Sequence, residues 1–297
     1  MSIKTFISKH FKNQLLTYVD VGAADNTDTR WWKISKSLEF IGFEPNSDQY
    51  KKITNKGFGK FNIHNFALGH KTGKMKLNIT KNEFVSSFLL PNFKNVNEYP
   101  NSNRFKIKKK ANIKVKKLDD LKLKIADFVK IDTQGYNLRV LKGSNSTIKK
   151  VLGIDIETEF FHMYKNQHLF EDTKKYLEKK NFIFINFYNL RRWQLYKSYN
   201  YGKLIWCNSL FLRKLKKNDY KNNILVLKYL IICVLYNNLD IAHQTLVKSR
   251  LPEHQKNQIR KFLKSENRKS YFIKIYISLF NRLSRFFGKE VELFPTF

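Results

Sequence analysis

Short apolar runs alternate with polar, helix-like stretches in the first part of the chain. The runs cover residues 18–22, 39–43 and 61–66, and each ends at or near a glycine or a proline, which favours a turn. Between the runs, Thr27 or Asp28 can cap one helix, and Ser47 or Asp48 can begin another. The order strand, helix, strand, helix, strand predicts a parallel α/β sheet.

The same alternation returns after a less regular stretch at residues 73–126, in which we expect two strands and an Asn-rich loop at 91–104. The further elements that the pattern predicts are strands at 74–79, 112–118, 127–131, 151–156, 182–187 and 206–212, and helices at 136–150 and 170–180.

After about residue 215 the pattern changes to helices alone. The expected helices cover residues 224–236, 241–249, 253–264 and 271–286. We therefore expect two domains, 1–214 and 215–297. Residues 271–287 have an aromatic face opposite a basic one, so this helix is expected to pack in a homo-oligomer or on its neighbours, or to lie on the inner membrane surface.

Composition narrows the choice of function class. Hydrophobic residues make up 42% of the 297, which excludes a disordered chain. The net charge of +33 comes from 57 Lys and Arg against 24 Asp and Glu, spread along most of the sequence. Abundant Lys, Asn, Ile and Phe indicate a coding bias, with acidic glycans, lipid head groups or RNA as alternative partners. Residues 13–29, 37–50 and 151–164 contain no Lys or Arg, which favours a cationic ligand there.

Cysteine and histidine usage argues against a metal or disulfide framework. Cys207 and Cys233 are too few for a cysteine-only zinc site or a disulfide scaffold, and no histidine pair has zinc-binding spacing. We expect no metal. With no apolar run near 20 residues and no leader-like segment, we expect a cytoplasmic protein.

The first strand-and-turn motif is Asp20-Val21-Gly22-Ala23-Ala24. A glycine turn between a strand and a helix lets a nucleoside ligand approach the backbone. Glu44 follows the next strand, where a carboxylate suits a pair of ribose hydroxyls. The later glycines of a pyrophosphate-binding turn are missing, which disfavours a nicotinamide enzyme.

Two further strands also end in acidic residues. Asp132 precedes Gln134 and Gly135 at the end of one strand, and Glu157 and Glu159 end the next. Because the carboxyl ends of parallel strands meet at one edge, these acids are expected to converge. Such a group suits a sulfonium, a metal ion or proton abstraction from a hydroxyl.

These motifs resemble the FkbM family of S-adenosylmethionine-dependent methyltransferases. The segments that carry the resemblance lie between about residues 15 and 213 and are YVDVGAADNTDT, FIGFEPNSDQYKKI, NFALGHKTG, VSSF, VKKLDDL, DFVKIDTQGYNLRVLKGS and GIDIETEFFHMYKNQHLFED. The resemblance implies a class I methyltransferase fold, a Rossmann-like and mostly parallel seven-stranded sheet with helices on both faces, followed by a helical extension. It also implies O-methylation of a sugar or glycan hydroxyl with S-adenosylmethionine as cofactor.

The resemblance also implies roles for individual residues. Asp20, Gly22 and Ala23 would line the methionine end of the cofactor, Glu44 the ribose, and Asn65, Ala67 and Leu68 the adenine. Ser86 and Ser87 match a serine pair near the site, and Asp132, Gln134 and Gly135 would border the methyl group and the acceptor. The family's first loop often has a further glycine, which Ala24-Asp25-Asn26 lacks.

The chemistry leaves three candidates for a base and several alternatives for function. The candidate bases are Asp132, Glu157 and His162, while Glu159 stays open between a site role and an ion pair. His64 and His168 are expected to be structural. An RNA or nucleobase methyltransferase and an inactive nucleoside-binding scaffold remain alternatives. Nucleic acid is not the expected partner, because no Asn-Pro-Pro-aromatic motif is present.

Overall fold

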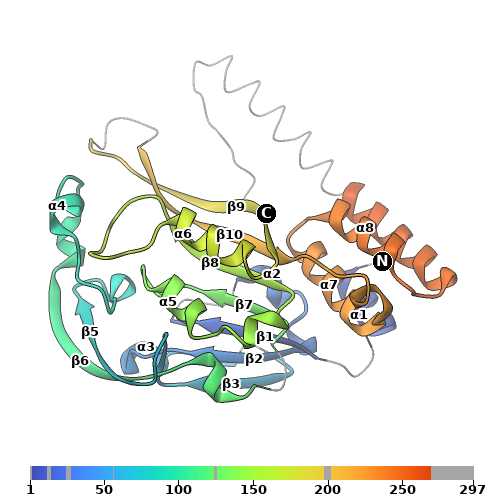
Figure 1. Ribbon diagram of the computed structural model, residues 1–297, viewed down its shortest axis with the longest axis horizontal. Helices are drawn as coiled ribbons and strands as arrows, with labels where there is room; N and C mark the ends of the chain where they lie inside the picture. The colour runs from blue at the N-terminus through green and yellow to red at the C-terminus, as the bar shows by residue number, and fades with distance from the viewer. Residues whose placement is uncertain are drawn as a thin grey trace, which may run out of the picture. The chain divides into compact units, whose positions relative to one another are not determined.

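The structure is a computed structural model that describes residues 2–11, 15–24, 28–55, 57–123, 126–196 and 202–268. The chain groups into two compact units (Figure 1). One consists of Leu15–Asp28 and Ser35–Lys214. The other consists of Met1–Gln14, Thr29–Ile34 and Leu215–Phe297, so two short segments assigned to the first domain from the sequence group with the C-terminal helices.

The larger unit is built on a seven-stranded sheet in the order β3-β2-β1-β7-β8-β10-β9. The strands are β1 (Leu16–Val21), β2 (Leu38–Phe43), β3 (Lys60–His64), β7 (Phe128–Ile131), β8 (Gly153–Glu159), β9 (Phe182–Trp193) and β10 (Lys203–Arg213). Only β10 runs antiparallel to its neighbours, β8 and β9. The remaining pairs are parallel. The predicted mostly parallel seven-stranded sheet is confirmed.

One face of this sheet carries the main core. Side chains alternate along each strand, so Val19 and Val21 of β1 share a face with Ile154 and Ile156 of β8. Helices α5 (Asn137–Lys142) and α6 (Phe170–Glu178) add apolar residues to the same cluster. Burying each large aliphatic side chain contributes about 1.5–3 kcal/mol, which holds the central strand ends in fixed positions.

The opposite face has a row of charged residues across three central strands. Asp20 of β1 lies beside Lys130 of β7, which lies beside Asp155 of β8. The Lys130 Nζ atom is 3.5 Å from Asp20 Oδ1, and Asp20 is fully buried. Neither carboxylate oxygen of Asp20 has a hydrogen-bond partner among the described residues. The Asp20 carboxylate, which belongs to the first strand-and-turn motif, is therefore buried on this face of the sheet.

A second sheet of three strands, ordered β4-β6-β5, lies in the middle of the sequence. Its strands are β4 (Ala67–Leu68), β5 (Gly73–Thr80) and β6 (Ile107–Lys116), in agreement with the predicted pair. The expected loop at 91–104 instead holds α4 (Phe93–Val96) and most of η3 (Ser102–Phe105). This segment is structured because Val96 and Phe105 are buried in a cluster with Met163 and Tyr164.

Several expected helices are shorter than the pattern suggested. The helix predicted at 136–150 consists of α5 and a separate turn, η5 (Thr147–Lys149). The break comes at Gly143, where a side chain would meet the Gly69 carbonyl oxygen at 1.9 Å. The other short elements are α2 (Thr29–Trp32), α3 (Ser47–Tyr50), η1 (Ser35–Ser37), η2 (Glu83–Val85), η4 (Leu118–Leu121) and η6 (Asp219–Lys221).

The smaller unit is entirely helical in its described residues. It contains α1 (Ile3–His10), α2, α7 (Asn223–Leu235), α8 (Leu239–Lys248) and a helix at 253–268. Phe6 stacks on Phe262 with ring centroids 4.8 Å apart, and Trp31 Nε1 donates to the Tyr236 hydroxyl at 3.3 Å. The predicted C-terminal helices are thus confirmed, whereas the amphipathic helix expected at 271–287 lies outside the described residues.

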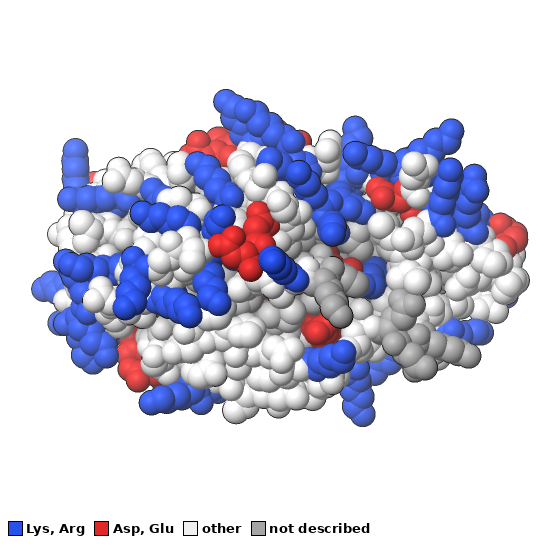
Figure 2. Space-filling view, turned by 60° about the horizontal axis from the view of Figure 1, so that its bottom comes forward, with Lys and Arg blue, Asp and Glu red and all other residues white. Residues whose placement is uncertain are grey.

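None of the helices in the described part of the chain is long and apolar enough to span a membrane. Lys and Arg cover much more of the face shown in Figure 2 than Asp and Glu do.

Candidate active site

A cavity of about 260 Å³ opens where the carboxyl ends of β1, β2, β7 and β8 meet. It is closed on other sides by η2, η3 and the ends of β9 and β10. Nine of the predicted site residues line it: Gly22, Glu44, Ala67, Leu68, Ser86, Ser87, Asp132, Gln134 and Glu157. Ligands of open α/β sheets bind at this edge, so the cavity is the candidate active site.

The turn after β1 brings bare backbone to the cavity. Gly22 has a φ of +85°, and a Cβ atom there would lie 1.9 Å from the carbonyl oxygen of Asp132. The amides of Gly22 and Ala23 both donate to the Phe43 carbonyl, at 2.9 and 3.1 Å. Only glycine fits this close approach of β1 and β7. Ala23 is buried behind the turn and does not line the cavity.

Glu44 stands at the end of β2 and is held by backbone amides. The Asn46 amide donates to Glu44 Oε1 at 2.7 Å, and the Ala24 backbone is a second donor. Burial raises the pKa of Glu44 to about 7, against the lowering effect of these hydrogen bonds. The carboxyl group is therefore fixed in place and poised to accept hydrogen bonds from a ligand.

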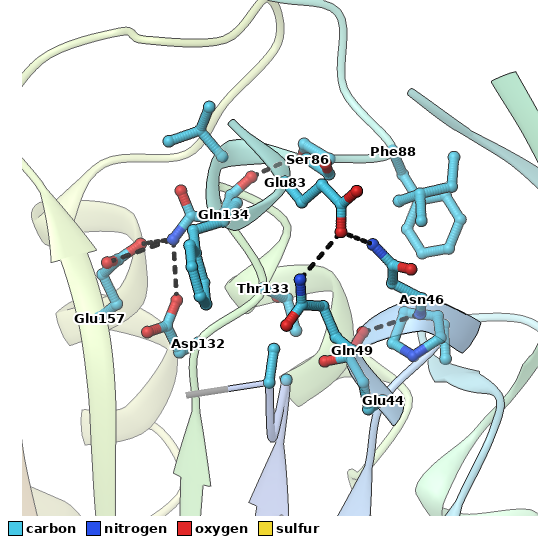
Figure 3. Close-up of a pocket in the computed structure, with 18 of the residues that line it drawn as sticks. Glu44, Asn46, Gln49, Glu83, Ser86, Phe88, Asp132, Thr133, Gln134 and Glu157 are labelled. Atoms are coloured by element: carbon cyan, nitrogen blue, oxygen red, sulfur yellow. Dashed lines mark hydrogen bonds between the residues drawn. The ribbon is translucent and has the colours of Figure 1, made fainter. Parts of the chain in front are cut away.

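Glu44 belongs to a polar network that the sequence analysis did not predict. Glu83 Oε2 accepts hydrogen bonds from Gln49 Nε2 at 2.8 Å and from Asn46 Nδ2 at 3.1 Å (Figure 3). All three side chains line the cavity. Asn46 and Gln49 come shortly after the end of β2. The motif Glu44-Pro45-Asn46 could therefore have indicated from the sequence that polar side chains line the site here.

The turn after β7 joins two carboxylates through one amide. Gln134 Nε2 donates to Asp132 Oδ1 at 3.0 Å and to Glu157 Oε1 at 3.2 Å (Figure 3). Gln134 itself has a φ of +50° and Gly135 a φ of +79°. This left-handed pair turns the chain so that Gln134 lies between the ends of β7 and β8.

Neighbouring side chains hold this turn in place. Asn137 accepts from the Thr133 amide at 2.7 Å and donates to the Glu157 carbonyl at 2.9 Å. The Tyr164 hydroxyl shares its hydrogen between Val85 O at 2.9 Å and Gln134 Oε1 at 3.1 Å. The Gln134 side chain is thus bonded at both ends of its amide.

Burial and mutual repulsion alter the acids of β8. The pKa of Glu157 is raised well above its usual value, first by burial and then by the charges of Asp132 and Glu159. Burial also raises the pKa of Glu159 to about 8. Glu159 does not line the cavity, and Asn137 Nδ2 donates to it at 3.4 Å. Glu157 faces the cavity, so a cation placed there would stabilise its carboxylate form.

The serine pair comes from the segment that directly follows η2. Ser87 Oγ donates to the Gln134 carbonyl at 2.7 Å, and Ser86 Oγ accepts from the Thr80 amide at 3.2 Å. Both residues line the cavity, and Ser87 ties the segment after η2 to the turn after β7.

Residues 20–184, more than half of the chain, match the Methyltransferase FkbM domain family. The chain belongs to the FkbM methyltransferase family. It therefore carries the methyltransferase domain that the resemblance implied. No match was found among curated proteins.

Solved structures similar to this FkbM chain include three methyltransferases of low sequence identity. The FkbM methyltransferase of Methylobacillus flagellatus KT is 15% identical, with a TM-score of 0.39, over 67% of this chain and 43% of that one. The chain thus spans less than half the length of that protein. Magnesium protoporphyrin IX methyltransferase of Synechocystis PCC 6803, with bound cofactor, is 8% identical, with a TM-score of 0.37, over 71% of this chain and 76% of that one. TrmK of M. capricolum, bound to S-adenosylhomocysteine, is 10% identical, with a TM-score of 0.30, over 89% of this chain and 98% of that one.

The cavity of the FkbM domain fits a cationic nucleoside cofactor. Its lining includes the carboxylates of Glu44, Glu83, Asp132 and Glu157, but Arg104 is the single Lys or Arg among the lining residues in the described part of the chain. In a chain of net charge +33, such a concentration of acids suits the sulfonium and ammonium charges of S-adenosylmethionine. Gly22 also lines the cavity, at the turn that follows β1.

Three predicted residues of the FkbM domain lie away from the cavity for structural reasons. His162 is exposed, and its carbonyl accepts from Asn95 Nδ2 at 3.0 Å, so its proposed role as a base is not supported. Asn65 donates to the Glu44 carbonyl at 2.9 Å and holds the ends of β2 and β3 together. Asp20 lies in the buried row with Lys130, one residue before the end of β1.

Gly135 and the other histidines also lie outside the cavity lining. Gly135 is buried against Tyr164, where a Cβ atom would meet the ring at 2.9 Å, so it shapes the turn. His64 stacks on Phe43, and His168 Nδ1 lies 3.5 Å from Asp172 Oδ2. These positions agree with the structural roles expected for both histidines.

A second set of lining residues has no counterpart among the predicted ones. We call Arg104, Phe105, Met163, Trp193 and Trp206 the aromatic side of the cavity, and Glu44, Glu83, Asp132 and Glu157 its acidic side. The aromatic side comes from η3, the segment after β8, and the two antiparallel strands. No common motif links these segments in the sequence.

Proposed function

We propose that the acceptor of this FkbM methyltransferase is a hydroxyl group of a sugar or glycan. The observation that carries the proposal is the meeting of two surfaces in one cavity. The Asp132–Gln134–Glu157 group can accept and donate hydrogen bonds to hydroxyls, and the aromatic residues Trp193 and Trp206 line the same cavity. The C–H face of a pyranose packs on such rings while its hydroxyls bond to carboxylates and amides.

Some residues of the site would bind the cofactor, and others would accept a proton from the acceptor. The Gly22 turn and Glu44 would hold the cofactor, whose sulfonium supplies the methyl group. Asp132 and Glu157 would accept the proton from the acceptor hydroxyl as its oxygen attacks. Gln134 keeps the two carboxylates at fixed positions, so positioning supplies much of the rate.

A cation beside the acids prepares Glu157 for this role. Burial and the charges of Asp132 and Glu159 raise the pKa of Glu157 well above its usual value, which disfavours its ionised form. A positive charge bound in the cavity lowers that pKa and favours the carboxylate. Proton acceptance is then coupled to binding of the cationic cofactor.

The test is a transfer assay with S-adenosylmethionine labelled in the methyl group. We expect label in a sugar or oligosaccharide fraction, with mass spectrometry showing one added CH2 on a hydroxyl. Total RNA serves as the competing acceptor, since the net charge of +33 favours RNA adhesion. Label in RNA, with none in any carbohydrate fraction, would overturn the proposal.

A further inference from the structure

Arg104 is a cation in the cavity wall that no carboxylate neutralises. Its Cζ atom lies 4.5 Å from the ring centroid of Trp193 and 5.1 Å from that of Phe105. Its Nε atom is buried with no hydrogen-bond partner. Across the described part of the chain, no ion pair or side-chain hydrogen bond is formed by this guanidinium.

Such an arrangement leaves the edge of the guanidinium unsatisfied. Aromatic rings stabilise its faces, but its N–H groups point in the guanidinium plane and need acceptors. Burial lowers the pKa of Arg104, and only the Tyr164 hydroxyl opposes that effect. Arg104 is only partly buried, so its N–H groups can bond to water until a ligand with acceptor atoms replaces that water.

The surroundings of Arg104 restrict that ligand to one with an apolar face. Met163, Trp193 and Trp206 line the same side of the cavity. Trp206 lies opposite Glu159 in the β8–β10 pairing, one strand from Glu157. A molecule bound on this side therefore lies next to Arg104 and in the same cavity as the proposed base.

We propose that Arg104 binds a negatively charged group on the acceptor, so that this methyltransferase acts on an acidic sugar carrying a carboxylate or a phosphate. The proposal rests on the sugar acceptor proposed above. The planar guanidinium fork matches either group with two parallel hydrogen bonds. The acceptor anion then occupies the aromatic side, while the cationic cofactor occupies the acidic side.

No carboxylate of the acidic side forms an ion pair with Arg104 in the described part of the chain. The charge of Asp132 raises the pKa of both Glu157 and Glu159, whereas no carboxylate is among the groups that shift the pKa of Arg104. The acidic side therefore does not supply a counter-charge for Arg104 and leaves it available to the acceptor.

The test compares sugars that differ only in charge. Methyl β-glucuronide, methyl β-glucoside and glucose 1-phosphate are titrated by calorimetry into the full chain loaded with S-adenosylhomocysteine. We expect a charged probe to bind about 10-fold or more tightly than the glucoside, as usual for charge-assisted hydrogen bonds. The glucuronide and the phosphate distinguish the two sources of charge.

Arg104→Met should abolish this preference, and Arg104→Lys should restore only part of it because lysine lacks the fork. Arg192→Met is the matched control: Arg192 is exposed on β9, its Nη1 donates to the Gly202 carbonyl, and it does not line the cavity. Unchanged S-adenosylhomocysteine binding shows that each variant is folded. Arg104 is one of 57 Lys and Arg residues, so its loss hardly changes the nonspecific attraction between the positively charged chain and an anionic probe.

Equal affinities for charged and neutral probes, no charged-probe binding at the highest soluble concentration, or a preference that Arg104→Met retains would each overturn the inference. Transfer to a neutral sugar that is insensitive to Arg104→Met would overturn it while leaving the proposed function intact. Transfer to RNA alone would overturn the proposed function itself.

Discussion

The two sides of the cavity are built in different ways. The acidic side consists largely of residues at or just after strand ends, and backbone amides or a bridging amide fix Glu44, Asp132 and Glu157 in position. The aromatic side is packed from rings, with Arg104, Phe105 and Trp193 in mutual contact. One side is determined by sheet topology and the other by side-chain packing. Changes to the acidic side should therefore affect chemistry and cofactor, and changes to the aromatic side should affect the acceptor.

The largest effect is expected from the carboxylates around Gln134. Asp132→Asn or Glu157→Gln should lower turnover by about 10²-fold or more, because proton acceptance is lost. S-adenosylhomocysteine binding, measured by calorimetry, should change much less. Asp120→Asn is the control, since Asp120 pairs with Lys117 and does not line the cavity. Full turnover in both amide variants would exclude proton acceptance by these carboxylates. Catalysis would then come from the positioning of cofactor and acceptor alone.

Glu44 should affect the cofactor rather than the reaction step. Glu44→Gln should weaken S-adenosylhomocysteine binding by about 1–3 kcal/mol, the usual effect of losing a charged hydrogen-bond acceptor. Calorimetric titration measures the change. Glu39→Gln, on the same strand but outside the cavity, should bind normally. Equal loss in both variants would indicate damage to β2 instead of a missing contact.

The acidic side should also make stability depend on pH. The pKa values of Glu44 and Glu159 are raised to about 7 and about 8, above those of an unfolded chain, so the folded protein holds more protons. This stability is complete below about pH 4.5 and is lost as pH rises through those values. Between pH 7 and pH 8 the free energy of unfolding should fall by about 1–2 kcal/mol.

Denaturant unfolding at the two pH values measures this loss. Glu159→Gln, which has no titrating group, should show a smaller fall. Histidines that burial affects have lowered pKa values and are largely neutral across this interval, so they contribute little. A free energy of unfolding that rises from pH 7 to pH 8 would contradict the raised carboxyl pKa values.

The smallest effect is expected at His162. His162→Ala should change kcat and KM by less than about 2-fold, as for an ordinary surface substitution. Steady-state kinetics over pH 6 to 8 will show whether a titrating group has been removed. Loss of the pH dependence would restore His162 as the base and would place part of the chemistry outside both sides of the cavity.

The sequence predicted the acidic side better than the aromatic side for a physical reason. Gly22, Glu44 and Asp132 each follow an apolar run directly, and parallel strands bring such positions to one edge. Asp20 was misplaced because alternation turns its side chain to the face opposite Val19 and Val21, toward Lys130. Asn65 was misplaced because it bonds the backbone of Glu44 instead of facing the cavity.

Arg104, Trp193 and Trp206 could not be found in the same way. Arg104 belongs to a segment expected to be a loop, and its partner Trp193 lies far along the chain at the end of β9. Their meeting depends on packing around Phe105 and Tyr99, for which sequence spacing holds no signal.

The position of β10 has a consequence for the order in which the protein folds. β9 has no partner in the sheet until β10, which follows it in the chain, inserts between β8 and β9. During synthesis from the N-terminus, β1, β2, β7 and β8 can pair first and bring the carboxylates together. Trp193 and Trp206 reach their places only when the last strand has been made, so a nascent chain acquires the means to hold the cofactor before the means to select an acceptor.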